Sequence, residues 1–336
     1  MAIKDKMAPQ LNINQLRQPY SQVLGWWDRS LPGTTLGTLL TFLAECSLLT
    51  RLCNSTTIDL AVNALSHGLP NLPDGKFRLW KYNQGQDSAL SLLNGIDIVK
   101  KIYLCGGTSG FEALSESLNN THLSWPQPNR HGMPHTYDTT QYVQELWRAT
   151  GRLKPLTFKA DLRAWSCHII RKSFGNSTVV GLHLKQVREY HGKSSISLAN
   201  ESVWLEFLTV AASQFDIQFL LLGDDPISKG IQVLPNTILA RNIGADSFSK
   251  HLALLSECAG FMGMMSSICN TVIFSDVPYV VFKNPDHHRQ QMLAEIGCVE
   301  YYPFATLYQK VIREHETSAR LLAELKLMPF AKSSSR

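Results

Sequence analysis

The sequence lacks several patterns that would assign it to a common class of protein. It has seven cysteines in 336 residues but no C-x-x-C pair, so it predicts neither a disulfide scaffold nor a structural zinc site. No apolar stretch reaches the length of a membrane span, and residues 1–14 are polar, without the apolar core of a signal peptide. We therefore expect a soluble, cytoplasmic chain.

Long runs of one charge are also missing. The 32 basic and 27 acidic residues leave a formal net charge of +5, spread along the chain without a basic cluster. This mild excess suits an anionic small ligand, and the absence of any recognised binding motif argues against a nucleic-acid partner.

The second half of the chain shows a regular alternation of short apolar runs and amphipathic segments. The apolar runs end in polar or glycine-rich turns, which is typical of parallel strands joined by helices. Five such strands with intervening helices predict one Rossmann-like domain. The expected strands are 179–185, 217–222, 237–241, 259–264 and 277–282.

The first half also alternates candidate strands with helix-like segments, but less regularly. Residues 57–61, 77–80 and 98–104 are candidate strands, whereas the chain from 123 to 137 is expected to be irregular. A length of 336 residues, 44% of them hydrophobic, fits two domains of ordinary size. We predict an α/β fold of two Rossmann-like domains facing a central cleft. The expected divisions are an N-terminal domain 1–160, a C-terminal domain 161–305 and a helical tail 306–336 that packs back across the join.

Polar side chains follow the expected strands of the second half, where a parallel sheet places its ligand crevice. His183 and Lys185 stand two residues apart on a strand and therefore share one face, so the lysine can neutralise a diphosphate. Asp224 and Asp225 follow the next strand and can accept hydrogen bonds from ribose hydroxyls. The alternative roles are a hydrogen-bonded core histidine and an aspartate that starts the turn at Pro226.

A third group of small polar residues follows the expected strand 259–264. Ser266, Ser267 and Asn270 are expected at the start of a helix, whose amides would form a phosphate seat, although simple capping by a serine is the alternative. Lys283 and Asn284 end the neighbouring strand and complete the predicted phosphate-binding site. Two adjacent aspartates without a suitably spaced third ligand predict no metal site.

Candidate residues in the first half are fewer. The loop with Gly33, Thr34 and Thr35 precedes an amphipathic helix and is expected to face an anion or a substrate hydroxyl, or to be an ordinary capped helix start. It matches neither a Walker A nor a G-x-G-x-x-G pattern. His131 lies in an aromatic and histidine-rich loop that can contact a sugar, with surface packing as the alternative.

Taken together, these residues resemble a known family. The second half is similar to the nucleotide-binding domain of GT-B glycosyltransferases, especially the fucosyltransferase-like superfamily with its H-x-R-R-x-D motif. The corresponding segment here is His183-Leu184-Lys185-Gln186-Val187-Arg188. Lys185 stands where the motif has arginine, and the closing aspartate is missing. Heptosyltransferase-like enzymes share the two-domain plan, so the transferred sugar stays open.

The resemblance implies metal-independent, inverting transfer from a nucleotide-diphosphate sugar, with no cofactor. Lys185 would stabilise the leaving diphosphate, and a base in the facing domain would take the acceptor proton. Asp28, beside Trp26 and Trp27, is the candidate base, with a structural role as the alternative and with Glu45 and His131 in reserve. The acceptor is expected to be a glycan, a lipid-linked molecule or a protein, and peripheral membrane association stays open. The alternatives to a transferase are a nucleotide-sugar epimerase and a non-catalytic nucleotide-sugar-binding module.

Overall fold

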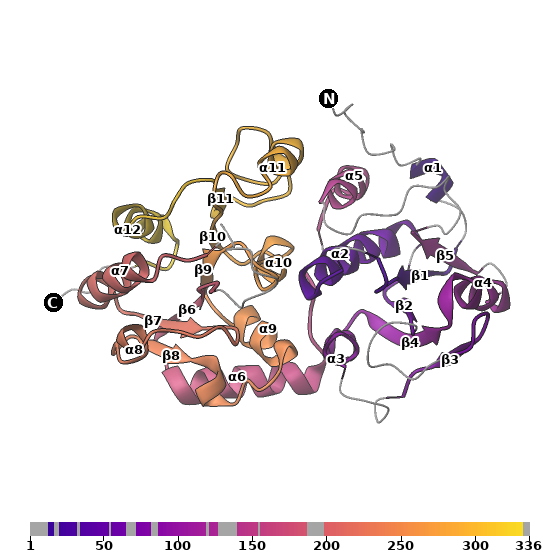
Figure 1. The fold of residues 1–336 in the computed structure, drawn as a ribbon, viewed down its shortest axis with the longest axis horizontal. Coiled ribbons are helices and arrows are strands. Elements are labelled where there is room, and N and C mark those ends of the chain that lie inside the picture. Colours follow the sequence, from indigo (N-terminus) through magenta and orange to yellow (C-terminus); the bar gives the residue numbers. More distant parts are fainter. Residues whose placement is uncertain are drawn as a thin grey trace. The chain divides into compact units, whose positions relative to one another are not determined.

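The computed structural model describes residues 13–16, 20–31, 34–53, 55–64, 72–81, 87–118, 121–126, 140–153, 155–186 and 198–331. Internal contacts divide the chain into two compact units, Met1–Thr157 and Phe158–Arg336. Figure 1 shows that each unit contains its own sheet with helices around it, as an α/β fold requires. In the described part of the chain, no helix has both the length and the apolar character needed to cross a membrane.

The first unit is built on a five-stranded sheet in the order β3-β4-β2-β1-β5. All neighbouring strands pair in parallel except β3, which is antiparallel to β4 at one edge. Thr35 caps α2 by accepting a hydrogen bond from the Thr38 amide, and the helix is buried over most of its length. The elements are α1 (Ile13–Leu16), β1 (Gln22–Trp27), α2 (Leu36–Leu52), β2 (Ile58–Asn63), β3 (Phe77–Leu79), α3 (Ser88–Gly95), β4 (Val99–Cys105), α4 (Gly107–Ser117), β5 (His122–Trp125) and α5 (Gln141–Thr150).

The second unit is built on a six-stranded parallel sheet in the order β11-β10-β9-β6-β7-β8. Numbered from β6, this is the 3-2-1-4-5-6 order of a Rossmann fold, and the order reverses between β6 and β9. The elements are α6 (Ala160–Phe174), β6 (Thr178–His183), α7 (Glu201–Gln214), β7 (Ile217–Leu221), α8 (Lys229–Gln232), β8 (Thr237–Leu239), the 3₁₀ helix Ala240–Ile243, α9 (Phe248–Ser256), β9 (Gly260–Met264), α10 (Cys269–Ile273), β10 (Tyr279–Phe282), α11 (Arg289–Ile296), β11 (Gln309–Ile312) and α12 (Ser318–Leu327).

Alternate residues of these strands point to opposite faces of the sheet, and this alternation places the candidate site. One face carries the apolar core that α7 and α12 cover, with Trp204 and Phe282 at its centre. The core residues of β6 and β10 are the even-numbered ones: Val180 and Leu182 of β6, with Leu184 just beyond its end, and Val280 and Phe282 of β10. The odd-numbered His183, Lys185 and Lys283 therefore belong to the opposite face.

The fold corrects several expectations from the sequence. Residues 306–336 do not form a purely helical tail, because residues 309–312 pair with β10 as strand β11 and α12 packs on α7 of the same unit. The segment expected to be irregular from residue 123 begins with strand β5, which pairs with β1. Strand β8 ends at Leu239, where the chain enters a 3₁₀ turn.

Helix ends in this chain depend on the backbone as well as on capping side chains. The N-terminal cap residues of α7 and α9 are Asn200 and Ser247, and neither side chain bonds to its helix. The side-chain oxygen of Asn200 accepts a hydrogen bond from the Ser202 hydroxyl instead, and Asp246, just before α9, forms an ion pair with Lys250. Gly151 ends α5 in the left-handed conformation, which glycine adopts without steric cost.

Candidate functional site

The candidate site lies at the carboxyl ends of β6, β7, β9 and β10. Parallel sheets of this order bind their ligands where the strand order reverses, which here is between β6 and β9. His183 is the last residue of β6, and Lys283 follows β10 directly. The expected clustering of His183, Lys185 and Lys283 at one edge of the sheet therefore follows from the topology.

Two lysines bring positive charge into this edge. Lys283 is buried, with 8% of its surface exposed, and Lys185 is half-buried. Burial lowers the pKa of Lys283; the Glu295 carboxylate opposes this shift, and the Lys185 ammonium adds to it. Burial also lowers the pKa of Lys185, against the opposing effects of Cys269 and Asp225. The two ammonium groups are thus close enough to repel each other, and an anion between them would relieve that repulsion.

Two histidines hold the turn after β7. The Nε2 atom of His183 lies 3.1 Å from Oδ2 of Asp225, and the His183 ring is almost fully buried. The Gly223 amide donates a hydrogen bond of 3.1 Å to Nδ1 of His251, so this nitrogen carries no proton. The other ring nitrogen of His251 lies 3.7 Å from Oδ1 of Asp224, and burial lowers the pKa of this histidine. Asp225 is thereby oriented by the buried His183 ring, whereas Asp224 lies beyond hydrogen-bond distance of Nε2 of His251.

The predicted phosphate seat after β9 is not built as expected. Helix α10 begins at Cys269, is five residues long, and has no side-chain cap, so neither Ser266 nor Ser267 starts it. Ser266 instead forms a turn in which its carbonyl accepts a hydrogen bond from the Cys269 amide. The hydroxyl of Ser266 lies 3.4 Å from the Cys269 sulfur. Asn270 lies inside α10 rather than ahead of it. Burial raises the pKa of the Cys269 thiol to about 11, so it is not a nucleophile at neutral pH.

Sequence reasoning missed His287, which follows Lys283 by four residues. Burial, together with Lys283, His288 and Lys185, lowers the pKa of His287 to about 4. Asn284, predicted as a donor-binding residue, shapes this loop: its side chain accepts a hydrogen bond from the Asp286 amide and its carbonyl accepts one from the His287 amide. The only sequence signal was the pair of histidines two residues after the Pro285 turn.

The candidate residues described in the first unit are hydrogen-bonded to their own loop, to the helix start or to the end of β2. Oδ1 of Asp28 accepts hydrogen bonds from the Ser30 amide, the Ser30 hydroxyl and the Asn63 side chain, so Asp28 closes the turn after β1. Thr34 donates to carbonyls of the same loop, and Thr35 caps α2. Gly33 and His131 lie outside the described residues.

Glu45, the reserve base, has a structural partner. It is fully buried within α2, and the indole nitrogen of Trp125 donates a hydrogen bond of 2.8 Å to Oε2 of Glu45. This burial separates the carboxylate from solvent. We therefore assign Glu45 to the packing of α2 on β5.

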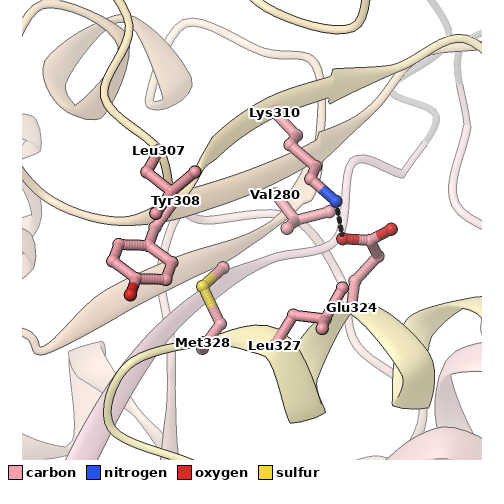
Figure 2. A pocket seen from close by; sticks show the side chains of 7 residues that line it. All are labelled: Val280, Leu307, Tyr308, Lys310, Glu324, Leu327 and Met328. Carbon is pink, nitrogen blue, oxygen red and sulfur yellow. Dashed lines mark hydrogen bonds and ion pairs between the residues drawn. The ribbon is translucent and has the colours of Figure 1, made fainter.

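An apolar pocket of about 250 Å³ lies elsewhere in the second unit. Figure 2 shows its lining, in which the Lys310–Glu324 ion pair of 2.8 Å borders apolar side chains from the start of β11 and the end of α12. Val280 and Tyr308 lie toward the amino ends of β10 and β11, opposite the edge where Lys283 lies. None of the predicted donor-site residues lines this pocket. Its lining consists of Val280, Leu307, Tyr308, Lys310, Glu324, Leu327 and Met328.

Within the described residues, no group of three histidine, cysteine, aspartate or glutamate side chains is arranged to hold a metal ion.

Comparison with known proteins identifies the fold. The sequence matches no family model and no curated protein. Among solved structures, the chain is similar to the glycosyl transferase family 9 protein from Veillonella parvula DSM 2008, with a TM-score of 0.51 and 8% identity over 93% of this chain and 90% of that one. It is also similar to ADP-heptose LPS heptosyltransferase II of E. coli, with a TM-score of 0.53 and 12% identity over 91% of this chain and 98% of that one. The chain therefore has the two-sheet α/β fold of GT-B glycosyltransferases, as its sequence predicted.

Proposed function

We propose that the chain is a glycosyltransferase that moves a sugar from a nucleoside-diphosphate donor to an acceptor, with the donor bound by the second unit. The observation that carries this proposal is the pair of lysines, Lys185 and Lys283, at the point where the strand order of a Rossmann sheet reverses. The similarity in fold to ADP-heptose LPS heptosyltransferase II supports the same class of donor.

The chemistry of transfer explains what these lysines would do. Breaking the bond between the sugar and the diphosphate leaves negative charge on the leaving group, and a fixed cation stabilises that charge in the transition state. Because Lys283 is buried, its field is screened less than that of a surface lysine. Glu295 favours the charged form of Lys283, so the ammonium can persist in this buried position.

The remaining donor contacts would come from the turn after β7. Asp224 is 71% exposed at its side chain, whereas Asp225 is held by His183. Carboxylates at this place in the fold accept hydrogen bonds from ribose hydroxyls. Under this proposal the lysines bind the diphosphate and the aspartates bind the nucleoside.

We further propose that the transfer inverts the configuration at the sugar carbon and needs no metal ion. The two lysines supply the charge that a metal ion would otherwise supply to the leaving group. Asp28 is proposed as the base that takes the acceptor proton, and the hydrogen bonds from Ser30 and Asn63 to its Oδ1 fix its orientation.

Nucleotide binding tests the lysine assignment. A thermal-shift screen with GDP, UDP, ADP, CMP and dTDP and their sugars is expected to raise the melting temperature of the native chain for one nucleotide series. Lys185→Ala and Lys283→Met should each bind that nucleotide about 10- to 100-fold more weakly, because each removes one charge-assisted contact. Lys250→Ala is the matched control, since Lys250 pairs with Asp246 on the surface.

Product analysis then separates transfer from its alternatives. With donor and acceptor present, the acceptor should gain the sugar as nucleoside diphosphate is released. Epimerised donor appearing without acceptor would identify an epimerase, and nucleotide binding without turnover would identify a binding module. Binding that is unchanged in both lysine variants would refute the proposed donor site.

A further inference from the structure

The loop between β10 and α11 presents His287 in a defined position. Lys283 ends the strand, and the next residue, Asn284, closes a turn through two hydrogen bonds, 2.9 Å from the Asp286 amide to its side chain and 3.1 Å from the His287 amide to its carbonyl. Side-chain-to-backbone bonds of this kind fix a turn without regular secondary structure. This turn therefore fixes the backbone of His287, which follows the buried Lys283 by four residues in the sequence.

His288 fixes the other side of the loop. It has a φ of 55°, in the left-handed region, and is the only non-glycine residue with positive φ in the described part of the chain. Its Nδ1 atom lies 2.9 Å from Oε1 of Gln291 in α11, and its ring centroid lies 4.2 Å from that of His287. A non-glycine residue in this region is unfavourable and persists only where its surroundings hold it. The loop thus orients the His287 ring at an energetic cost.

The described groups that shift the pKa of His287 carry no negative charge. The charged and titratable groups that act on it are Lys283 after β10, Lys185 after β6 and His288 at the start of α11, and together with burial they lower its pKa to about 4. The Nδ1 atom of His287 is buried and has no hydrogen-bond partner among the described residues. A neutral imidazole beside two ammonium groups, with a buried nitrogen left unsatisfied, forms a site that a multiply charged anion would complete.

We propose that His287 is a third ligand of the donor diphosphate and that it binds the phosphate by taking up a proton from the solvent. This inference rests on the proposed function, because it concerns the same diphosphate site. When the anion occupies the site, its negative charge outweighs the repulsion from the lysines, so the protonated imidazole becomes favourable and donates a hydrogen bond to a phosphate oxygen. The added positive charge offsets part of the charge of the diphosphate.

Under this proposal, anion binding is coupled to protonation of His287, so the affinity for the anion depends on pH. The pKa of His287 is about 4 in the empty site, and occupation by an anion raises it. Between these two values the complex holds one more proton than the free protein, so affinity rises as the pH falls through the pKa of the bound form. Above that pKa the histidine stays neutral in both states and adds no pH dependence.

Calorimetry with inorganic pyrophosphate and with ADP tests the proposal. Binding to the native chain and to His287→Gln is measured at pH 8, 7 and 6, each in two buffers that differ in ionisation enthalpy. Glutamine keeps a hydrogen-bonding side chain but cannot take up a proton. Comparing the two proteins cancels the protonation of the ligand itself. From pH 8 to pH 6 the affinity of the native chain should increase by about threefold or more relative to the variant, with a larger proton uptake.

The control is His168→Gln, which makes the same substitution at an exposed histidine of α6, outside the candidate site. It should retain the proton uptake of the native chain. Equal proton uptake and equal pH dependence in the native chain and His287→Gln would overturn the role of His287, as would loss of both in His168→Gln. If Lys185→Ala and Lys283→Met still weaken binding in that case, the proposed function survives. If no pyrophosphate or ADP binds to the native chain, the donor site and this inference both fail.

Discussion

At the scale of single residues, Gly223 shows how the donor-side turn depends on close contact. It has a φ of +88°, and a Cβ atom at this position would lie 2.8 Å from two atoms of the His183 ring. The same residue donates its amide hydrogen to His251. A glycine here therefore allows the turn to pass between two buried histidines, and it keeps Asp224 and Asp225 in place.

Gly223→Ala should lower the free energy of unfolding more than Gly151→Ala does. Both residues have positive φ, +88° and +78°, but a Cβ atom at Gly151 would meet nothing within 4 Å. The comparison offsets the cost of positive φ, and crowding against His183 leaves a difference of about 1–3 kcal/mol. Urea unfolding of the two variants measures this difference. Equal destabilisation would mean that the His183 ring moves aside without cost.

At the scale of secondary-structure elements, the sequence predicted best the apolar strands of the second unit. The five predicted strands there all exist, because runs such as 217–222 are apolar on both faces. The sequence did not predict three strands: β1, which is buried and has six residues, and β5 and β11, which have four each. β5 and β11 carry too little pattern, and their pairing with β1 and β10 is decided by residues far away in the chain.

Strand β5 also shows how a distant contact fixes a helix. The 2.8 Å hydrogen bond from Trp125 to Glu45 joins the end of β5 to the buried middle of α2. Trp125→Phe removes this donor and is expected to cost about 1–3 kcal/mol of unfolding free energy, because a buried carboxylate loses a partner. The aromatic contact of residue 125 with Tyr142, whose ring centroid lies 5.7 Å away, can persist in this variant.

A double-mutant cycle with Glu45→Leu isolates this bond, because leucine has no acceptor for the Trp125 indole. Each single variant leaves one buried polar group without its partner, whereas the double variant leaves neither, so the double variant should be less destabilised than the sum of the two single variants. Denaturant unfolding of the four proteins gives the coupling energy. Simple additivity would show that the hydrogen bond contributes nothing to stability.

At the scale of the whole molecule, the proposal divides the chemistry between the two units. The proposed donor contacts belong to the second unit, and the proposed base, Asp28, belongs to the first. Binding and turnover should therefore respond separately to substitutions in the two units. This separation distinguishes a transferase from a module that only binds its nucleotide.

Asp28→Asn tests the division. Asparagine retains an oxygen that can accept the hydrogen bonds from Ser30 and Asn63, but it cannot take a proton. We expect sugar transfer to fall by about 10²- to 10⁴-fold, with binding of the donor nucleotide unchanged. Release of nucleoside diphosphate measures transfer, and calorimetry measures binding. Native turnover in this variant would remove Asp28 from the reaction and leave it as the residue that closes the turn after β1.

The sequence by itself determined the α/β class, the fold and the edge of the sheet at which the candidate site lies. Strand periodicity places His183 and Lys185 on one face, and in a parallel sheet the polar residues that follow the strands meet at one edge. Only the tertiary structure decided which side chains lie together there. It placed His287 beside Lys185 and Lys283, and it moved the start of α10 away from the two serines. The physical reason is that periodicity is local, whereas burial and electrostatic contact depend on neighbours distant in the sequence.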